Sequence, residues 1–171
     1  MGLDQYLYAH KHMAEYEWYG ETAVGEWQRT KQAAGFDLVA GGQLSPVGRS
    51  GEISVCVAYW RKSNMVHAWF VRNCSPGQKD DCSRLKVSRE NLVELRRTCS
   101  DLLLDKKRER AYATLPPQDG FLFGSLEVDD LYWQDLQDTV GQLDLVLERW
   151  FPLRRKDASI DDVFFSYQAS W

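Results

Sequence analysis

The feature that most constrains the fold is a change of hydrophobic period inside residues 53–71, which read ISVCVAYWRKSNMVHAWFV. From 53 to 60, β-branched and aromatic residues recur with a period of two, which predicts a β-strand. We expect this strand to be central in the sheet. Ser63 or Asn64 is a good helix N-cap, and the apolar residues that follow recur at helical spacing. The cations Arg61 and Lys62 therefore lie between the predicted strand and the predicted helix.

The remaining apolar patterns predict an α+β domain. Period-two alternation predicts further strands at 3–11, 85–87 and 163–171, with 36–40 as an additional short candidate. Helical spacing predicts helices over 16–34, from Ser88 through the run DKKRER to the prolines at 116–117, and over 126–150 with Ser125 as its cap. This order favours one domain over 1–171, with a mixed or mostly antiparallel sheet of about four strands, adjacent terminal strands, and helices packed on one face.

Composition narrows the classes of function. A chain of 171 residues that is 44% hydrophobic and 13% aromatic can bury a core, which excludes a disordered protein. The net charge of -4 disfavours non-specific nucleic-acid binding, although a local basic patch stays open. No apolar run approaches the roughly 20 residues of a membrane span, and the start MGLDQYLYAHKH lacks the apolar core of a signal peptide. We therefore expect a cytoplasmic protein.

The four cysteines are expected to be thiols, because disulfides are rare in cytosolic proteins of this size. Cys74 and Cys82 flank a polar loop one helix away from His67, and a zinc site could be assembled there. No C-x-x-C pair is present, so structural thiols are the favoured interpretation. We expect neither a metal nor an organic cofactor.

Two predicted helices differ in the charges at their starts. The long helix opens with Glu127, Asp129 and Asp130, which already complement the positive end of its dipole. The helix after the central strand has no acid in its first turn, so free backbone N–H groups, two cations and two short polar side chains converge there. A phosphate or carboxylate prefers that combination. The expected site for a small anionic ligand comprises Trp60 as a stacking surface for a base, Arg61, Lys62, Ser63, Asn64 and His67.

An ordinary structural role for the same residues stays open. Arg61 and Lys62 can simply end the strand, or can pair with Asp80, Asp81 or the carboxylate at the end of the chain. By helical geometry His67 lies off the apolar face, which is typical of a surface residue. To act as a general base it would need an orienting partner that the sequence does not identify.

No catalytic motif is present. A nucleophile elbow, a zincin or deaminase signature, and paired metal-binding carboxylates on a clear scaffold are all missing. The remaining catalytic candidate is a constellation of His67, Asp81 and Cys82. The sequence therefore leans away from an enzyme and leaves a small hydrolase or transferase as an alternative.

Six motifs together resemble a family of small uncharacterised proteins encoded by bacteriophages and prophages. They span nearly the whole chain and read MGLDQYL, YWRKSNMVHAWFV, DDC, L-P-x-Q-x-G-F-x-F-G-S, DLYWQDLQDTV and SYQASW. The chain departs from the family pattern at Ser63, Met65 and Val66, where Ala, Ala and Ile are expected, and at Leu122, where Phe is expected. These changes keep the helix intact and make Asn64 the surer N-cap.

The resemblance implies a setting rather than a mechanism. Small phage accessory proteins serve host takeover or counter-defence by sequestering a signalling nucleotide or by blocking a host complex. The leading hypothesis is thus a non-enzymatic accessory protein of the host cytoplasm that binds an anionic ligand, such as a nucleotide signal, or a host partner. The alternative is an inhibitor of a host defence or nucleic-acid-handling complex, comparable to anti-CRISPR proteins. A homodimer stays open.

Overall fold

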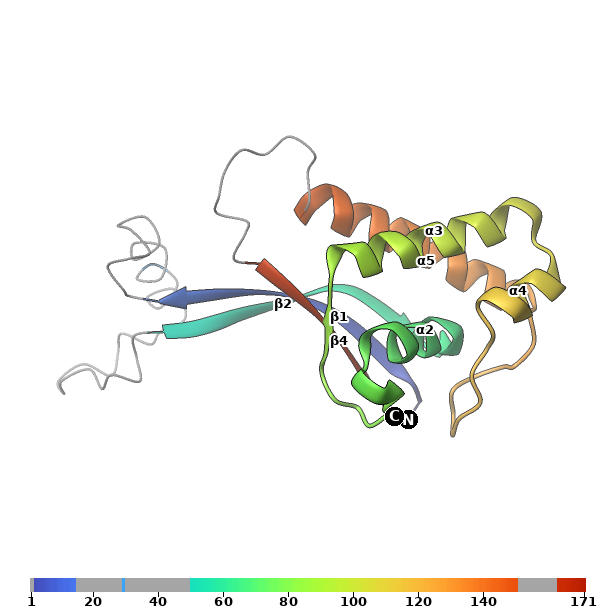
Figure 1. Cartoon of the computed structure of the whole chain (residues 1–171), viewed down its shortest axis with the longest axis horizontal. Coiled ribbons are helices and arrows are strands. Elements are labelled where there is room, and N and C mark those ends of the chain that lie inside the picture. The colour runs from blue at the N-terminus through green and yellow to red at the C-terminus, as the bar shows by residue number, and fades with distance from the viewer. Residues whose placement is uncertain (1, 15–28, 30–49, 151–162) are drawn as a thin grey trace. The chain divides into compact units, whose positions relative to one another are not determined.

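The computed structural model describes residues 2–14, 29, 50–150 and 163–171. The four strands are β1 (Asp4–Ala14), β2 (Ser50–Arg61), β3 (Leu85–Val87) and β4 (Val163–Ser170). The helices are α2 (Asn64–Cys74), α3 (Arg89–Asp105), α4 (Arg108–Thr114) and α5 (Asp130–Trp150), with a 3₁₀ turn η4 (Pro76–Gln78) after α2 (Figure 1). Apart from residue 29, the helix expected over 16–34 and the strand expected over 36–40 lie outside the described residues.

The strands form one antiparallel sheet in the order β2-β1-β4-β3, which confirms the predicted α+β class and the adjacency of the terminal strands. The prediction that residues 53–60 form a central strand is wrong, because β2 lies at the edge of this sheet. Alternation of side chains reports burial of one face and says nothing about the number of neighbouring strands. A helix covers part of the exposed edge: Tyr59 N–H donates to Gln142 Oε1 of α5 at 2.8 Å.

The helices cover one face of the sheet. The inward residues of the strands are buried, and they are Leu3, Leu7, Ala58, Trp60, Leu85, Val87, Phe165 and Tyr167. The Phe70 ring of α2 stacks on the Tyr167 ring with centroids 4.1 Å apart, and the indole N–H of Trp60 donates to Thr139 of α5 at 2.9 Å. Each large apolar side chain buried in this layer contributes about 1.5 to 3 kcal/mol to folding. The opposite sheet face carries no helix within the described residues.

The chain divides into two compact units. One comprises residues 1–9 and 55–171, and the other comprises residues 10–54. All of the helices named above and both hollows described below belong to the first unit. The expectation of one domain over 1–171 stays a prediction.

Helix boundaries differ from the predicted ones at two charged segments. The helix that begins after Ser88 ends at Asp105 because Lys106 takes a left-handed conformation, with φ at 48°, and α4 then starts afresh at Arg108. The long helix begins at Asp130, and the Asp129 carboxylate accepts the Tyr132 N–H at 3.0 Å as its cap. Among the helices that the structure describes, none is long and apolar enough to cross a bilayer.

Candidate functional site

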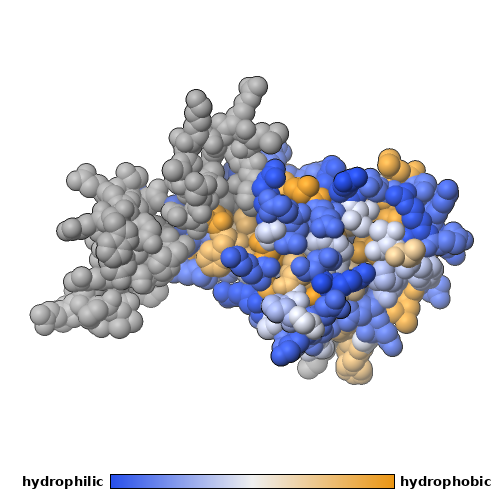
Figure 2. Space-filling model, viewed as in Figure 1, coloured by the Kyte–Doolittle hydropathy of each residue, from blue (hydrophilic) through white to orange (hydrophobic). Residues whose placement is uncertain are grey.

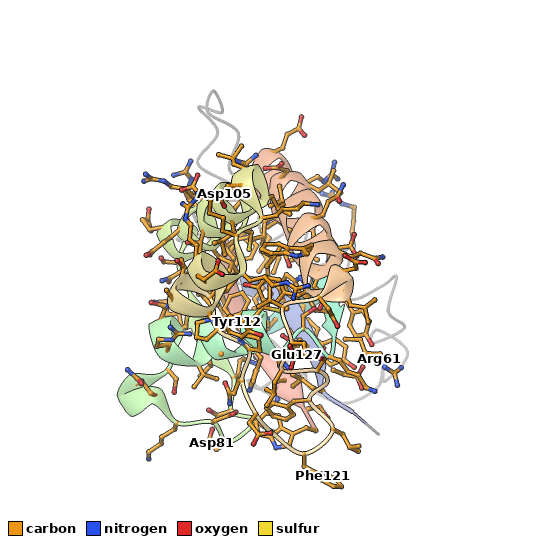
Figure 3. The ribbon with its side chains drawn as sticks, turned by 90° about the vertical axis from the view of Figure 1, so that its right-hand side faces the viewer. Arg61, Asp81, Asp105, Tyr112, Phe121 and Glu127 are labelled. Carbon is orange, nitrogen blue, oxygen red and sulfur yellow. The ribbon has the colours of Figure 1, made fainter. Side chains whose placement is uncertain are left out.

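A cleft of about 370 Å³ opens at the junction between β2 and α2. Its walls come from this junction, from the loop before α5, and from the first turns of α5. The lining residues are Arg61, Lys62, Asn64, Met65, Gly124, Ser125, Glu127, Asp129, Leu131, Tyr132 and Asp135. In Figure 3, Arg61 lies at the right, Glu127 lies to its left, and Phe121 lies below both. The volume falls in the range of small-molecule sites, roughly 300 to 1,000 Å³.

The backbone turns sharply at Lys62 to build this cleft. Lys62 has a φ of 60°, and its N–H donates to the Leu3 carbonyl at 2.8 Å. The loop before α5 packs directly against this turn, because a Cβ on Gly124 would stand 3.1 Å from the Lys62 carbonyl oxygen. Gly124 also has a φ of 109°, a conformation that side chains rarely adopt. The cleft therefore depends on a glycine at this position.

Asn64 connects the same two segments, which corrects its predicted role as the helix cap. It is the first residue of α2, and its Nδ2 donates to the Ser125 carbonyl at 2.9 Å. Its Oδ1 is one of two buried side-chain polar atoms without a partner in the described part of the chain. Ser63 occupies the N-cap position but makes no side-chain capping bond. Ser63 instead acts on Asp135 of α5, because burial raises the pKa of that carboxyl group and the Ser63 side chain opposes the rise.

Trp60 cannot serve as the stacking surface that the sequence suggested. It is 3% exposed, its ring packs against Phe70 with centroids 5.9 Å apart, and its N–H is engaged by Thr139. The alternating strand pattern puts residue 60 on the same face as residue 58, and that face is the covered one. Trp60 is a core residue.

The charges of the cleft are mixed, because carboxyl groups from other segments join the two cations. Arg61 and Lys62 are exposed, and neither forms an ion pair with another described residue. The first turn of α2 contains no acid, as predicted, but Glu127, Asp129 and Asp135 come from other segments. Burial raises the pKa of Asp135 above its ordinary value, against the Ser63 hydrogen bond that lowers it. Two cations thus face three carboxyl groups.

His67 does not line the cleft; it belongs to a separate buried network. It is 1% exposed, which corrects the expectation of a surface residue. Its Nε2 lies 3.0 Å from Asp80 Oδ1, and its Nδ1 lies 2.8 Å from the Tyr167 hydroxyl. The network continues from Asp80 Oδ2 to Gln118 at 2.9 Å, and from Tyr167 to Gln5 at 3.1 Å. The orienting partner that the sequence could not identify is Asp80.

Proton counting assigns the hydrogen bonds of this network. Burial lowers the pKa of His67 despite the nearby Asp80 carboxylate, so the imidazole is neutral at pH 7. Its single proton then sits on Nε2 and is donated to Asp80, and Nδ1 accepts from the Tyr167 hydroxyl. The same hydroxyl lies 3.1 Å from Gln5 Oε1, which is the second acceptor within its reach.

The predicted catalytic residues gather around a hollow that is too small for a substrate. His67, Asp81 and Cys82 all line it, together with Asp80 and Tyr167, but its volume is about 10 Å³, which holds about one water molecule. The Asp81 carboxylate accepts the Ser83 N–H at 3.1 Å and does not orient His67. The hollow beside His67 therefore has no space for a substrate molecule in this structure.

All four cysteines are free thiols, as predicted. Burial raises the pKa of Cys74 to about 11 and that of Cys99 to about 12, so neither is a thiolate at neutral pH. Within the described residues, no group of three or more His, Cys, Asp or Glu side chains is arranged to hold a metal ion.

The loop before α5 carries an exposed apolar cluster that the sequence did not single out. In the segment GFLFGS, Phe123 is buried, whereas Phe121 is 82% exposed. Leu122, Leu126 and Leu131 are also exposed, and Leu131 lines the rim of the cleft. Figure 2 shows apolar side chains protruding at the lower end of this loop.

Comparison of the chain with protein-family models, with curated proteins and with solved structures gave no match.

Proposed function

We propose that the chain is a non-enzymatic binding protein whose ligand occupies the cleft between β2, α2 and the start of α5. The observation that carries this proposal is a hollow of small-molecule size at the strand-to-helix junction, with two cations on its wall that pair with no other described residue. Arg61 and Lys62 would hold an anionic group of the ligand. The apolar side chains of Met65 and Leu131 would contact its uncharged part.

The carboxyl groups narrow the class of ligand. A free phosphate ion would meet Glu127, Asp129 and Asp135 as well as the two cations, and repulsion would offset much of the attraction. A ligand with an anionic group at one end and N–H or O–H donors at the other satisfies both walls. Nucleotides have this chemistry, because the phosphate suits Arg61 and Lys62 while ribose hydroxyls or exocyclic amines donate to carboxylates.

The biological setting in this proposal comes from the six sequence motifs. A cytoplasmic phage accessory protein that sequesters a signalling nucleotide would act in host takeover or counter-defence. The structure supports the non-enzymatic part of this proposal in one respect. The hollow beside the catalytic candidates His67, Asp81 and Cys82 has no space for a substrate, so we propose that the cleft binds its ligand without converting it.

A thermal-shift screen with nucleotides, cyclic ones included, tests the proposal. A ligand at 100 times its Kd stabilises the folded state by about 2.7 kcal/mol, which raises the melting temperature by several degrees. The Arg61→Ala, Lys62→Ala variant should lose this shift. The Arg97→Ala, Arg108→Ala variant removes the same charge from α3 and α4 and should keep it.

The carboxylate wall has its own test. Asp135→Asn preserves the shape of the side chain and should weaken a nucleotide while leaving any response to inorganic phosphate unchanged or stronger. The proposal is wrong if no compound stabilises the wild type more than the Arg61→Ala, Lys62→Ala variant.

A second candidate function is inhibition of a host protein complex through the apolar cluster of Phe121, Leu122, Leu126 and Leu131. Exposed aromatic anchors of this kind dominate the energies of protein interfaces. In a pull-down from host lysate, one stoichiometric partner should be captured by the wild type and lost with Phe121→Ser. Leu104→Ser, which changes an equally exposed residue of α3, should retain it. If both variants capture the partner as well as the wild type does, the apolar cluster is not the binding surface.

A further inference from the structure

The loop before α5 ends in an apolar turn, although the tips of turns are usually polar. The Phe123 N–H donates to the Gly120 carbonyl at 3.2 Å, so Phe121 and Leu122 are the two central residues of the turn, and both are exposed (Figure 3). Gly, Asn, Asp and Ser dominate such positions in proteins. Leu122 also has a φ of 62°, which a side chain of its size rarely adopts. A strained residue that holds apolar side chains in solvent points to a use beyond folding.

The apolar surface continues from this turn towards α5. Leu126 and Leu131 are exposed as well. The Tyr112 hydroxyl of α4 fixes the backbone between them, because it donates to the Leu126 carbonyl at 3.4 Å and accepts the Val128 N–H at 3.2 Å. The apolar cluster of Phe121, Leu122, Leu126 and Leu131 is therefore anchored to a neighbouring helix at its centre.

Acidic residues accompany the apolar cluster. From 111 to 148 the chain contains eight acidic residues and neither Lys nor Arg. Four of these acids lie within two positions of a member of the cluster, and they are Asp119, Glu127, Asp129 and Asp130. None of the four forms an ion pair with another residue in the described part of the chain. The cluster is thus interleaved with unpaired negative charge.

Charges from neighbouring segments do not cancel these acids. The charged residues that such segments bring are Arg61, Lys62 and Asp135 of the cleft, Arg108, Glu109 and Arg110 of α4, and Lys79, Asp80 and Asp81 of the loop that Gln118 contacts. Arg110 is already paired with Asp105 of α3 at 3.2 Å. The remaining cations and acids of these segments are equal in number, so the four acids beside the cluster stay in excess.

This combination selects one class of partner. An acidic surface with apolar anchors attracts a protein segment that carries Lys or Arg beside its own apolar side chains. The same surface repels a second copy of itself, because like charges would face each other across a two-fold interface. It also repels nucleic acid, whose phosphates are negative.

We propose that the apolar cluster and the acids beside it bind a basic segment of another protein. Phe121 and Leu122 insert among apolar side chains of the partner, and the acids pair with its cations. This proposal rests on the second candidate function and names the chemistry of its partner. A buried aromatic anchor dominates the energy of such an interface, whereas charges at its rim set the rate of association and its dependence on salt.

Fluorescence anisotropy with a designed peptide tests the proposal. The probe is a labelled amphipathic peptide of about 14 residues made of Leu and Lys, with Leu at helical spacing, and the full chain is the titrant. Binding should saturate and should weaken as the salt concentration rises. A peptide with Glu in place of each Lys should bind about 10-fold more weakly or worse.

Variants at the turn test the apolar anchor. Phe121→Ser should weaken binding of the Leu/Lys peptide about 10-fold or more, because it removes an exposed aromatic side chain on which the core does not depend. Leu104→Ser changes an equally exposed residue of α3 and should bind like the wild type. The Arg61→Ala, Lys62→Ala variant should bind at least as tightly as the wild type, which separates this surface from the ligand of the cleft.

A second pair of variants tests the charges. Asp119→Asn, Asp130→Asn should weaken binding about 2-fold to 10-fold at low salt and should reduce the dependence on salt. Glu94→Gln, Glu148→Gln removes the same charge from exposed positions on α3 and near the other end of α5, and it should leave the affinity unchanged.

Several results would overturn the proposal. One is the absence of saturable binding at low salt up to about 100 µM, and another is a Glu peptide that binds as tightly as the Lys peptide. A dimer that Phe121→Ser dissociates, measured by sedimentation equilibrium, would assign the cluster to a second copy instead. A host partner that Phe121→Ser releases, but that neither salt nor Asp119→Asn, Asp130→Asn affects, would leave the second candidate function standing and contradict the basic chemistry of the partner.

Discussion

The Tyr167 hydroxyl is the centre of the buried network, and its removal should be costly. It lies between His67 Nδ1 at 2.8 Å and the Gln5 amide at 3.1 Å, and both of these partners are buried. Tyr167→Phe leaves both polar groups without a partner. Each unsatisfied buried group costs about 1 to 3 kcal/mol, and the costs of two groups in one network do not add fully, so we expect a loss of about 2 to 4 kcal/mol in the free energy of unfolding.

Urea denaturation followed by tryptophan fluorescence measures this loss. The free energy of unfolding falls by about 2 kcal/mol per molar urea for a small protein, so the urea midpoint should fall by about 1 to 2 M. The dependence on urea concentration should stay the same. Tyr59→Phe is the matched control, because it deletes the same hydroxyl from an exposed ring, where the hydrogen bond to Asp4 contributes less than about 1 kcal/mol. Equal midpoints for the two variants would refute the idea that the network stabilises the fold.

Three further outcomes follow from the contacts. Burial lowers the pKa of His67, so below the ordinary value of about 6.5 the unfolded chain binds a proton at this residue more readily than the folded chain does. The folded state should therefore lose stability as the pH drops from about 7 to 5, which urea midpoints measure. The decrease should be smaller in His67→Gln. Gly124→Ala combines a positive φ with a close contact to the Lys62 carbonyl, and differential scanning calorimetry should detect a lower melting temperature than for Gly141→Ala, where a Cβ has open space. Arg96→Ala breaks an exposed pair with Asp144, with bonds of 2.8 and 3.1 Å, and should cost no more than about 1 kcal/mol by urea titration.

Local patterns predicted the elements well. The change of period at residues 53–71 located β2 and α2, and the helix predicted to begin at Ser88 is capped there, with the Ser88 hydroxyl accepting the Asn91 N–H at 3.1 Å. These features depend on neighbours within a few residues. Strand order depends on distant segments, so the pattern could not reveal that β2 is an edge strand.

The candidate site was predicted in part for the same reason. Arg61 and Lys62, which the sequence singled out, line the cleft, and their role in binding a ligand stays a prediction. It could not bring in Asp135, which is 72 positions beyond Ser63 and contacts it only through the packing of α5 against the junction. Likewise, Tyr167 meets His67 across 100 positions of sequence. The charges within the first turn of a helix can be read from the sequence, because they depend on neighbouring residues. A carboxyl group that another helix brings to that turn depends on the tertiary structure, and the sequence pattern does not reveal it.

The most direct test of the central claim, that the junction cleft holds a small ligand, is native mass spectrometry of the protein purified without denaturation. The wild type should carry an adduct of constant mass, either as purified or after addition of the nucleotide that gives the largest thermal shift. Arg61→Ala, Lys62→Ala should lose the adduct, and Arg97→Ala, Arg108→Ala should retain it. A wild-type protein that carries no adduct under either condition, or a cleft variant that carries the same adduct as the wild type, would contradict the account.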